Sequence, residues 1–146
     1  MNVYTAGSRF WGGQVDRIDS GIKELGHEVT QCPKSADILY SNDPGGYDEI
    51  IAEKLAGSIR GKIVFNVQDI PTHLVDYDVN KLREKLLQAD VITSISDFTR
   101  GEVNKHCGLN STVVYQPIKP IFADKCYVGV EGKYRIRFLS VGRRFD

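Results

Sequence analysis

The stretch ADVITSISDFT, residues 89–99, decides the fold class of this chain. Its centre, residues 91–95, is a short apolar run rich in β-branched side chains, which predicts a buried parallel strand. Ser96 follows at the position of a helix N-cap. The helix is expected to run to about His106 and to stop at Gly108. A strand that leads directly into a helix is the repeating unit of an α/β sheet.

Ser94 and Ser96 lie at the carboxyl end of this predicted strand, where open α/β sheets bind their ligands. The free backbone N–H groups at a helix start can bind an oxyanion. Both serines are therefore candidate substrate-binding residues. The alternative is that Ser96 only caps the helix.

Strands and helices alternate along the rest of the chain. Strands are expected at residues 2–6, 27–32, 37–41, 62–67, 112–115 and 135–142. Helices are expected from about residue 14 to 25, 47 to 59 and 79 to 89. The run 62–67 is continuous and apolar, so we expect it to be a central strand. The alternation predicts an α/β fold with one Rossmann-like, doubly wound parallel sheet and helices on both faces.

Three of these helices carry apolar residues at three- and four-residue spacing, which predicts one face packed on the sheet. The stripes are Val15, Ile18, Ile22 and Leu25, then Ile51, Leu55 and Ile59, and then Val79, Leu82, Leu86 and Ala89. Between the second helix and the strand before it, residues 42–46 (NDPGG) predict a turn.

Composition excludes several classes of function. The 146 residues carry 19 basic and 19 acidic side chains, and no basic patch indicates nucleic acid or an anionic membrane. No apolar run is long enough for a transmembrane segment, and no signal peptide precedes the first strand, so we expect a cytoplasmic protein. Three widely spaced cysteines (Cys32, Cys107 and Cys126) predict neither a disulfide framework nor a metal site.

The loop GSRFWGG, residues 7–13, is a candidate binding loop. Gly12 and Gly13 would let the backbone approach a diphosphate at the start of the first helix. Arg9 is a candidate partner for an anion, and Trp11 could face an acceptor. The alternatives are a tight turn made by the glycines and an aromatic lid on the edge of the core.

Three stretches together resemble the family-four glycosyltransferases, which have the GT-B fold. Residues 89–122 (ADVITSISDFTR…GLNSTVVYQPIKPIF) are similar to a strand, helix and strand of that family. Residues 25–30 (LGHEVT), after the paired glycines, resemble its opening. Residues 138–143 (FLSVGR) resemble the strand that opens its second domain. One departure is QPIK at residues 116–119, where the family usually has N-G-V-D.

The resemblance implies that residues 1–122 form the N-terminal, acceptor-binding domain. Residues 123–134 would be a linker, and residues 135–146 would begin a second domain. It implies transfer of a sugar from a nucleotide-sugar donor to a sugar or lipid-linked acceptor, with retention and without a metal or further cofactor. The donor-binding half is expected to be absent from this chain, which would then be inactive alone. The strand 135–142 could pair with a second copy and form a homodimer.

The resemblance also implies two candidate catalytic residues. Asp69 matches by order the family's His or Asp near the acceptor hydroxyl, and His73 lies close by. A carboxylate at a strand end could orient that hydroxyl and take its proton. Asp43, also at a strand end, could contact ligand. The alternatives are turn formation for Asp43, capping or turn formation for Asp69, and a solvated His73.

Two other functions remain open at this point. The first is a non-catalytic sugar- or nucleotide-binding module with the same fold. The second is an unrelated nucleotide enzyme, such as an NAD-dependent reductase. The absence of a GxGxxG loop and of a Tyr-x-x-x-Lys pair argues against the second.

Overall fold

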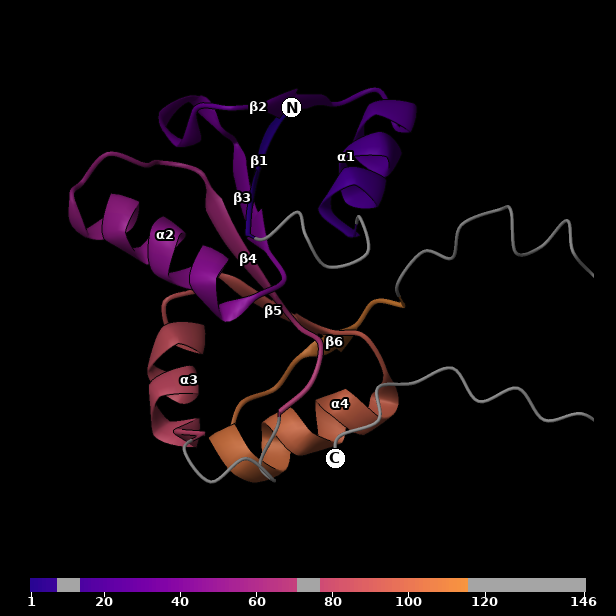
Figure 1. Cartoon of the computed structure of the whole chain (residues 1–146), viewed down its shortest axis with the longest axis vertical. Coiled ribbons are helices and arrows are strands. Elements are labelled where there is room, and N and C mark those ends of the chain that lie inside the picture. Colours follow the sequence, from indigo (N-terminus) through magenta and orange to yellow (C-terminus); the bar gives the residue numbers. More distant parts are fainter. Residues whose placement is uncertain (8–13, 71–76, 116–146) are drawn as a thin grey trace, which may run out of the picture.

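Six parallel strands form one sheet in the computed structural model, which describes residues 1–7, 14–70 and 77–115 (Figure 1). The strands are β1 (Asn2–Ala6), β2 (Glu28–Thr30), β3 (Ile38–Ser41), β4 (Lys62–Val67), β5 (Val91–Ser94) and β6 (Thr112–Val113). The α-helices are α1 (Gln14–Glu24), α2 (Pro44–Leu55), α3 (Val79–Leu86) and α4 (Asp97–Glu102). A 3-10 turn spans Pro33–Ser35, and a π-helical turn, η2 (Val103–Cys107), extends α4.

The order of the strands is β2-β1-β3-β4-β5-β6. From β1 the chain first moves to β2 at one edge of the sheet. It then crosses back past β1 to β3 and continues in that second direction through β4 and β5 to β6. Right-handed crossovers in opposite directions place their helices on opposite faces of the sheet. Figure 1 shows α1 on one side of the sheet and α2 and α3 on the other. The predicted Rossmann-like, doubly wound fold is therefore confirmed, with β4 in the interior of the sheet.

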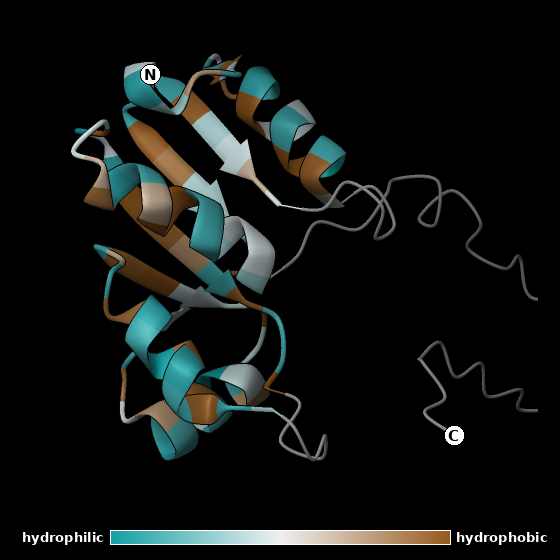
Figure 2. Cartoon of the chain, turned by 60° about the vertical axis from the view of Figure 1, so that its left-hand side comes forward, coloured by the Kyte–Doolittle hydropathy of each residue, from teal (hydrophilic) through white to brown (hydrophobic). Residues whose placement is uncertain are grey.

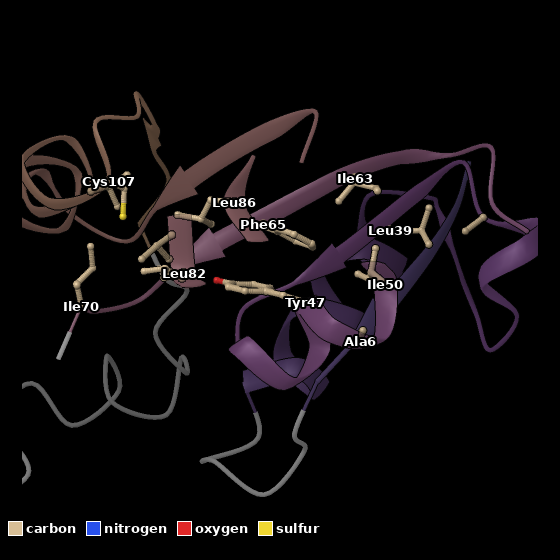
Figure 3. Packing of buried hydrophobic residues seen from close by; sticks show 13 residues of the cluster. Ala6, Leu39, Tyr47, Ile50, Ile63, Phe65, Ile70, Leu82, Leu86 and Cys107 are labelled. Atoms are coloured by element: carbon tan, nitrogen blue, oxygen red, sulfur yellow. The ribbon is translucent and has the colours of Figure 1, made fainter. Parts of the chain in front are cut away.

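The main core lies between the sheet and the face covered by α2, α3 and η2 (Figure 3). The side chains of Leu39, Ile50, Phe65 and Leu86 are fully buried there. Tyr47 of α2 stacks on Phe65 of β4 with ring centroids 4.3 Å apart. Figure 2 shows apolar residues gathered in the strands and much polar surface on the helices, as burial of one helix face requires.

Helix α2 starts earlier than predicted. Residues 44–46, which the sequence predicted as part of a loop turn, form the first helical turn of α2. It begins at Pro44 rather than Tyr47 and ends at Leu55 rather than near residue 59. The carboxylate of Asp43 caps the helix by accepting a hydrogen bond from Gly46 N at 2.9 Å. Proline is well suited to the first helical position, where its missing N–H leaves no hydrogen bond unmade. Turn-forming residues and helix-starting residues are thus the same types, and spacing alone did not distinguish them.

The predicted apolar stripes are wrong at their ends. Leu25 follows the last residue of α1 and is 76% exposed, and Leu55 ends α2 and is 79% exposed. The predicted buried strand at residue 91 begins with a half-exposed Val91. Within α1, the buried polar residue is Asp19, which accepts a hydrogen bond from Thr5 Oγ1 at 2.7 Å.

The helix expected from residue 96 to 106 is confirmed in extent but not in regularity. After α4, the chain makes the π-helical turn η2, and Gly108 ends it with a left-handed φ of 66°. Arg83 of α3 donates a hydrogen bond from Nε to the carbonyl of Cys107 at 3.0 Å. This contact holds the end of η2 against α3.

Candidate functional site

All six strands are parallel, so their carboxyl ends meet at one edge of the sheet. In open α/β sheets ligands bind outside this edge, next to the point where the strand order reverses. Here the order reverses between β1 and β3. Asp43, Asp69 and Ser96 each lie two residues after the end of β3, β4 and β5, and Ser94 ends β5. The fold therefore places these four predicted residues along the same edge.

The reversal point itself is closely packed. Gly7, after β1, has a φ of 122°, and a Cβ there would lie 2.1 Å from Asp43 Oδ2. A Cβ on Gly46 would lie 2.2 Å from Ser41 Oγ and 2.8 Å from the backbone of Ala6. The two glycines thus let the end of β1 approach the first turn of α2.

Asp43 places a carboxylate at the positive end of α2. Its Oδ1 accepts from Gly46 N, so the protein itself supplies the negative charge that a helix N-terminus favours. A phosphate at this helix start would be repelled by Asp43. The sequence predicted a turn at Asp43, and the structure shows that Asp43 caps α2 instead; its contact with a ligand stays a prediction.

Asp69 is exposed immediately beyond β4. Burial raises the pKa of Tyr47, and the charges of Asp43 and Asp69 raise that pKa further. Burial also raises the pKa of Tyr77 to about 12, with smaller contributions from Cys107 and Asp69. The raised pKa values keep both phenols protonated well above neutral pH.

The two serines of β5 and its following turn have structural partners. Ser94 is fully buried, with its Oγ 2.6 Å from the Oγ of Ser111, which precedes β6. Ser96 caps α4 by accepting from Thr99 N at 3.1 Å. Thr99 Oγ1 in turn donates to the carbonyl of Gln68 after β4 at 3.2 Å. The capping interpretation of Ser96 is confirmed, and substrate binding by either serine stays a prediction.

Five other candidate residues lie outside the described residues. They are Arg9, Trp11, Gly12 and Gly13 of the glycine-rich loop, and His73. Their proposed roles stay predictions.

A pocket that the sequence analysis missed lies between the N-terminal turns of α2 and α3. It has a volume of about 170 Å³ and is lined by Pro44, Tyr77, Asp78, Lys81, Leu82 and Lys85. The four-residue spacing of Lys81 and Lys85 places them on one helix face, and that signal was available in the sequence. What the sequence lacked was the position of Pro44 beside them. A second, more polar depression of about 450 Å³ runs along α1 and β2.

The described part of the chain has neither a cluster of metal ligands nor a membrane-spanning helix. No three His, Cys, Asp or Glu side chains there converge as a metal site requires. None of the helices in those ranges has the length and apolar character needed to cross a bilayer. Cys32 and Cys107 are free thiols, the first exposed and the second buried.

Neither the models of known protein families nor the curated proteins contain a match to this chain. The class of protein is therefore defined by the fold and the sheet edge alone. It is a Rossmann-like α/β protein whose candidate site is the edge formed by the ends of β1, β3, β4 and β5. Such a fold supports many activities, so the function has to be argued from the residues at that edge.

Proposed function

We propose that this chain is the acceptor-binding domain of a retaining glycosyltransferase. The observation that carries the proposal is the exposed carboxylate of Asp69 at the end of an interior strand, beside the reversal point of the sheet. The order of the three stretches that resemble family-four glycosyltransferases supports the same assignment.

In this proposal Asp69 receives the acceptor. Its carboxylate accepts a hydrogen bond from the acceptor hydroxyl and takes the proton as the glycosidic bond forms. The bond that breaks joins the anomeric carbon of the donor sugar to its diphosphate. His73 and Trp11 are the other proposed contacts of the acceptor.

The position of Asp43 helps to place the donor. Its carboxylate occupies the positive end of α2, so the donor diphosphate belongs elsewhere. Gly12, Gly13 and Arg9, before α1, are the proposed contacts from this domain. Further groups that hold the nucleotide sugar would come from a second domain, and closure between the two domains would exclude water. The proposed setting is the cytoplasm.

The test is an amide chemical-shift titration of the 146-residue chain with nucleoside diphosphates and with methyl glycosides. We expect the glycosides to shift the Asp69 amide, and Asp69→Asn to weaken their binding. Saturable nucleotide binding without any glycoside binding would contradict the acceptor role. Glycoside binding that Asp69→Asn leaves unchanged would remove Asp69 from the site and favour a sugar-binding module.

Self-association through residues 135–142 is a separate proposal. The mass in solution of the full chain and of a variant that ends at residue 122 tests it. A dimer that becomes a monomer on truncation supports pairing through this strand. A monomer in both cases rules it out.

A further inference from the structure

The pocket between α2 and α3 is lined by apolar and by charged residues, hereafter its wall and its rim. Pro44 and Leu82 form part of the wall, together with the ring of Tyr77. Asp78, Lys81 and Lys85 bring the charged groups. A sugar ring has the matching character, since its C–H faces are apolar and its edges carry hydroxyl groups.

Two of the rim side chains are held in place. Lys85 Nζ lies 2.8 Å from Asp48 Oδ2, and this ion pair joins α3 to α2. Asp78 Oδ1 accepts hydrogen bonds from the backbone N–H groups of Asn80 and Lys81, at 3.0 and 3.2 Å. Groups that are ordered before binding lose less entropy when a ligand arrives, which favours recognition.

The remaining rim residue is adjustable. The side chain of Lys81 is 75% exposed, and its Nζ lies 3.8 Å from Asp78 Oδ2. It can therefore turn to a ligand hydroxyl without breaking a buried contact.

The charges of the pocket favour an uncharged ligand. Lys81 and Lys85 are balanced by Asp78 and Asp48. Asp43 lies directly before Pro44 and adds a further negative charge. Because the positive charges are already balanced, a phosphate or a nucleotide would gain little electrostatic binding energy here.

The size points to a single ring. A volume of about 170 Å³ is well below the roughly 300–1,000 Å³ of pockets that bury larger ligands, so the pocket is too small for a nucleotide. Pro44 connects the pocket to the candidate edge, because it lines the pocket and directly follows Asp43.

We propose that the pocket lined by Pro44, Tyr77, Asp78, Lys81, Leu82 and Lys85 binds an uncharged pyranose ring of the acceptor. The inference rests on the proposed glycosyltransferase function and narrows its acceptor to a neutral saccharide. The ring lies on the wall formed by Tyr77 and Leu82. Asp78 accepts hydrogen bonds from its hydroxyls, and the two lysines donate to them.

The experiment is an amide chemical-shift titration of the 146-residue chain with methyl glycosides of glucose, galactose and mannose. Glucose 6-phosphate and a nucleoside diphosphate serve as charged probes. We expect at least one methyl glycoside to shift the amides of Tyr77, Asp78 and Lys81. Lys81→Ala should weaken its binding about 3- to 10-fold, as the loss of one hydrogen bond of ordinary net strength predicts.

Lys105→Ala is the matched control. Lys105 is 68% exposed and lies 3.7 Å from Glu102 in the same three-residue relation that Lys81 has to Asp78. It lies in η2, outside the pocket, so its replacement should leave binding unchanged. Equal effects of the two substitutions would overturn the assignment of the pocket.

The outcomes separate this inference from the proposed function. Glycoside-induced shifts at Asp69 without shifts at residues 77–82 overturn the pocket and leave the acceptor role standing. If glucose 6-phosphate binds more tightly than methyl glucoside and this binding depends on Lys81, the inference that the acceptor is uncharged is overturned. Absence of glycoside binding at both places overturns both proposals.

Discussion

At the scale of single residues, Gly7 and Asp43 shape the reversal point of the sheet. Gly7 combines a left-handed φ with an approach to the Asp43 carboxylate that leaves no room for a methyl group. Asp43 meanwhile satisfies a backbone N–H of α2. A change at either position therefore acts on the edge where ligands are expected.

Gly7→Ala should lower the free energy of unfolding by more than about 2 kcal/mol, because backbone strain and a steric clash add. Urea unfolding followed by circular dichroism measures the loss. Gly21→Ala in α1 is the control, since a Cβ there meets nothing within 4 Å. It should stabilise the protein by about 0.5–1 kcal/mol. Equal stability of the Gly7→Ala variant and the parent would contradict the close approach.

Asp43→Ala should destabilise the protein by about 1 kcal/mol through loss of the α2 cap. Asp43→Asn keeps an acceptor for Gly46 N and should cost clearly less. The two variants are compared by urea unfolding at neutral pH. If Asp43→Asn is as damaging as Asp43→Ala, the charge rather than the hydrogen bond matters, and the capping explanation is insufficient.

At the scale of elements, contacts between helices determine how the far end of the sheet is covered. Helix α3 contacts α2 through Lys85 and Asp48, and it contacts η2 through Arg83 and the carbonyl of Cys107. The second contact joins a cation to a helix C-terminus, where the macrodipole favours positive charge.

Arg83→Ala should lower the free energy of unfolding by about 1–2 kcal/mol, because it removes a charged donor from a carbonyl. Lys81→Ala, on the same helix but 75% exposed, should change it by less than about 0.5 kcal/mol. Thermal or urea unfolding compares them. Indistinguishable stabilities would show that the Arg83 contact contributes nothing.

At the scale of the whole molecule, the fold holds three tyrosines in their neutral form. Burial raises the pKa values of Tyr40 and Tyr77 to about 12, and it raises that of Tyr47 further. Because the folded pKa exceeds the unfolded value of 10.0, this stability is complete below pH 10.0. It is lost as the pH rises from there through the folded pKa, near 12 for Tyr40 and Tyr77.

We therefore expect urea stability to fall steadily between about pH 10 and about pH 12. In the native state, phenolate absorbance should show part of the seven tyrosines titrating late. The stability of the Tyr77→Phe variant, which lacks one of these phenols, should fall less steeply with pH. A stability that is flat across this range, or seven tyrosines that titrate together, would contradict the burial of these phenols.

The fold was predictable from local signals to a large extent. The run 62–67 is a strand with the expected bounds, and the helix start at Ser96 and the stop at Gly108 are as predicted. Helix ends were less predictable, since NDPGG fits both a turn and a capped helix start. The candidate site was predictable in part: strand ends marked Asp43 and Asp69, whereas Tyr77 and the pocket beside it gave no such signal.

The sequence by itself determined which segments become strands and helices, because hydrophobic period and capping residues act over a few neighbouring positions. Only the tertiary structure decided that Ser94 is buried against Ser111 and that Pro44 meets residues 77–85 across a pocket. It also decided the strand order, and with it the reversal point beside Gly7. These features depend on contacts between residues far apart in the chain, which a local pattern does not encode.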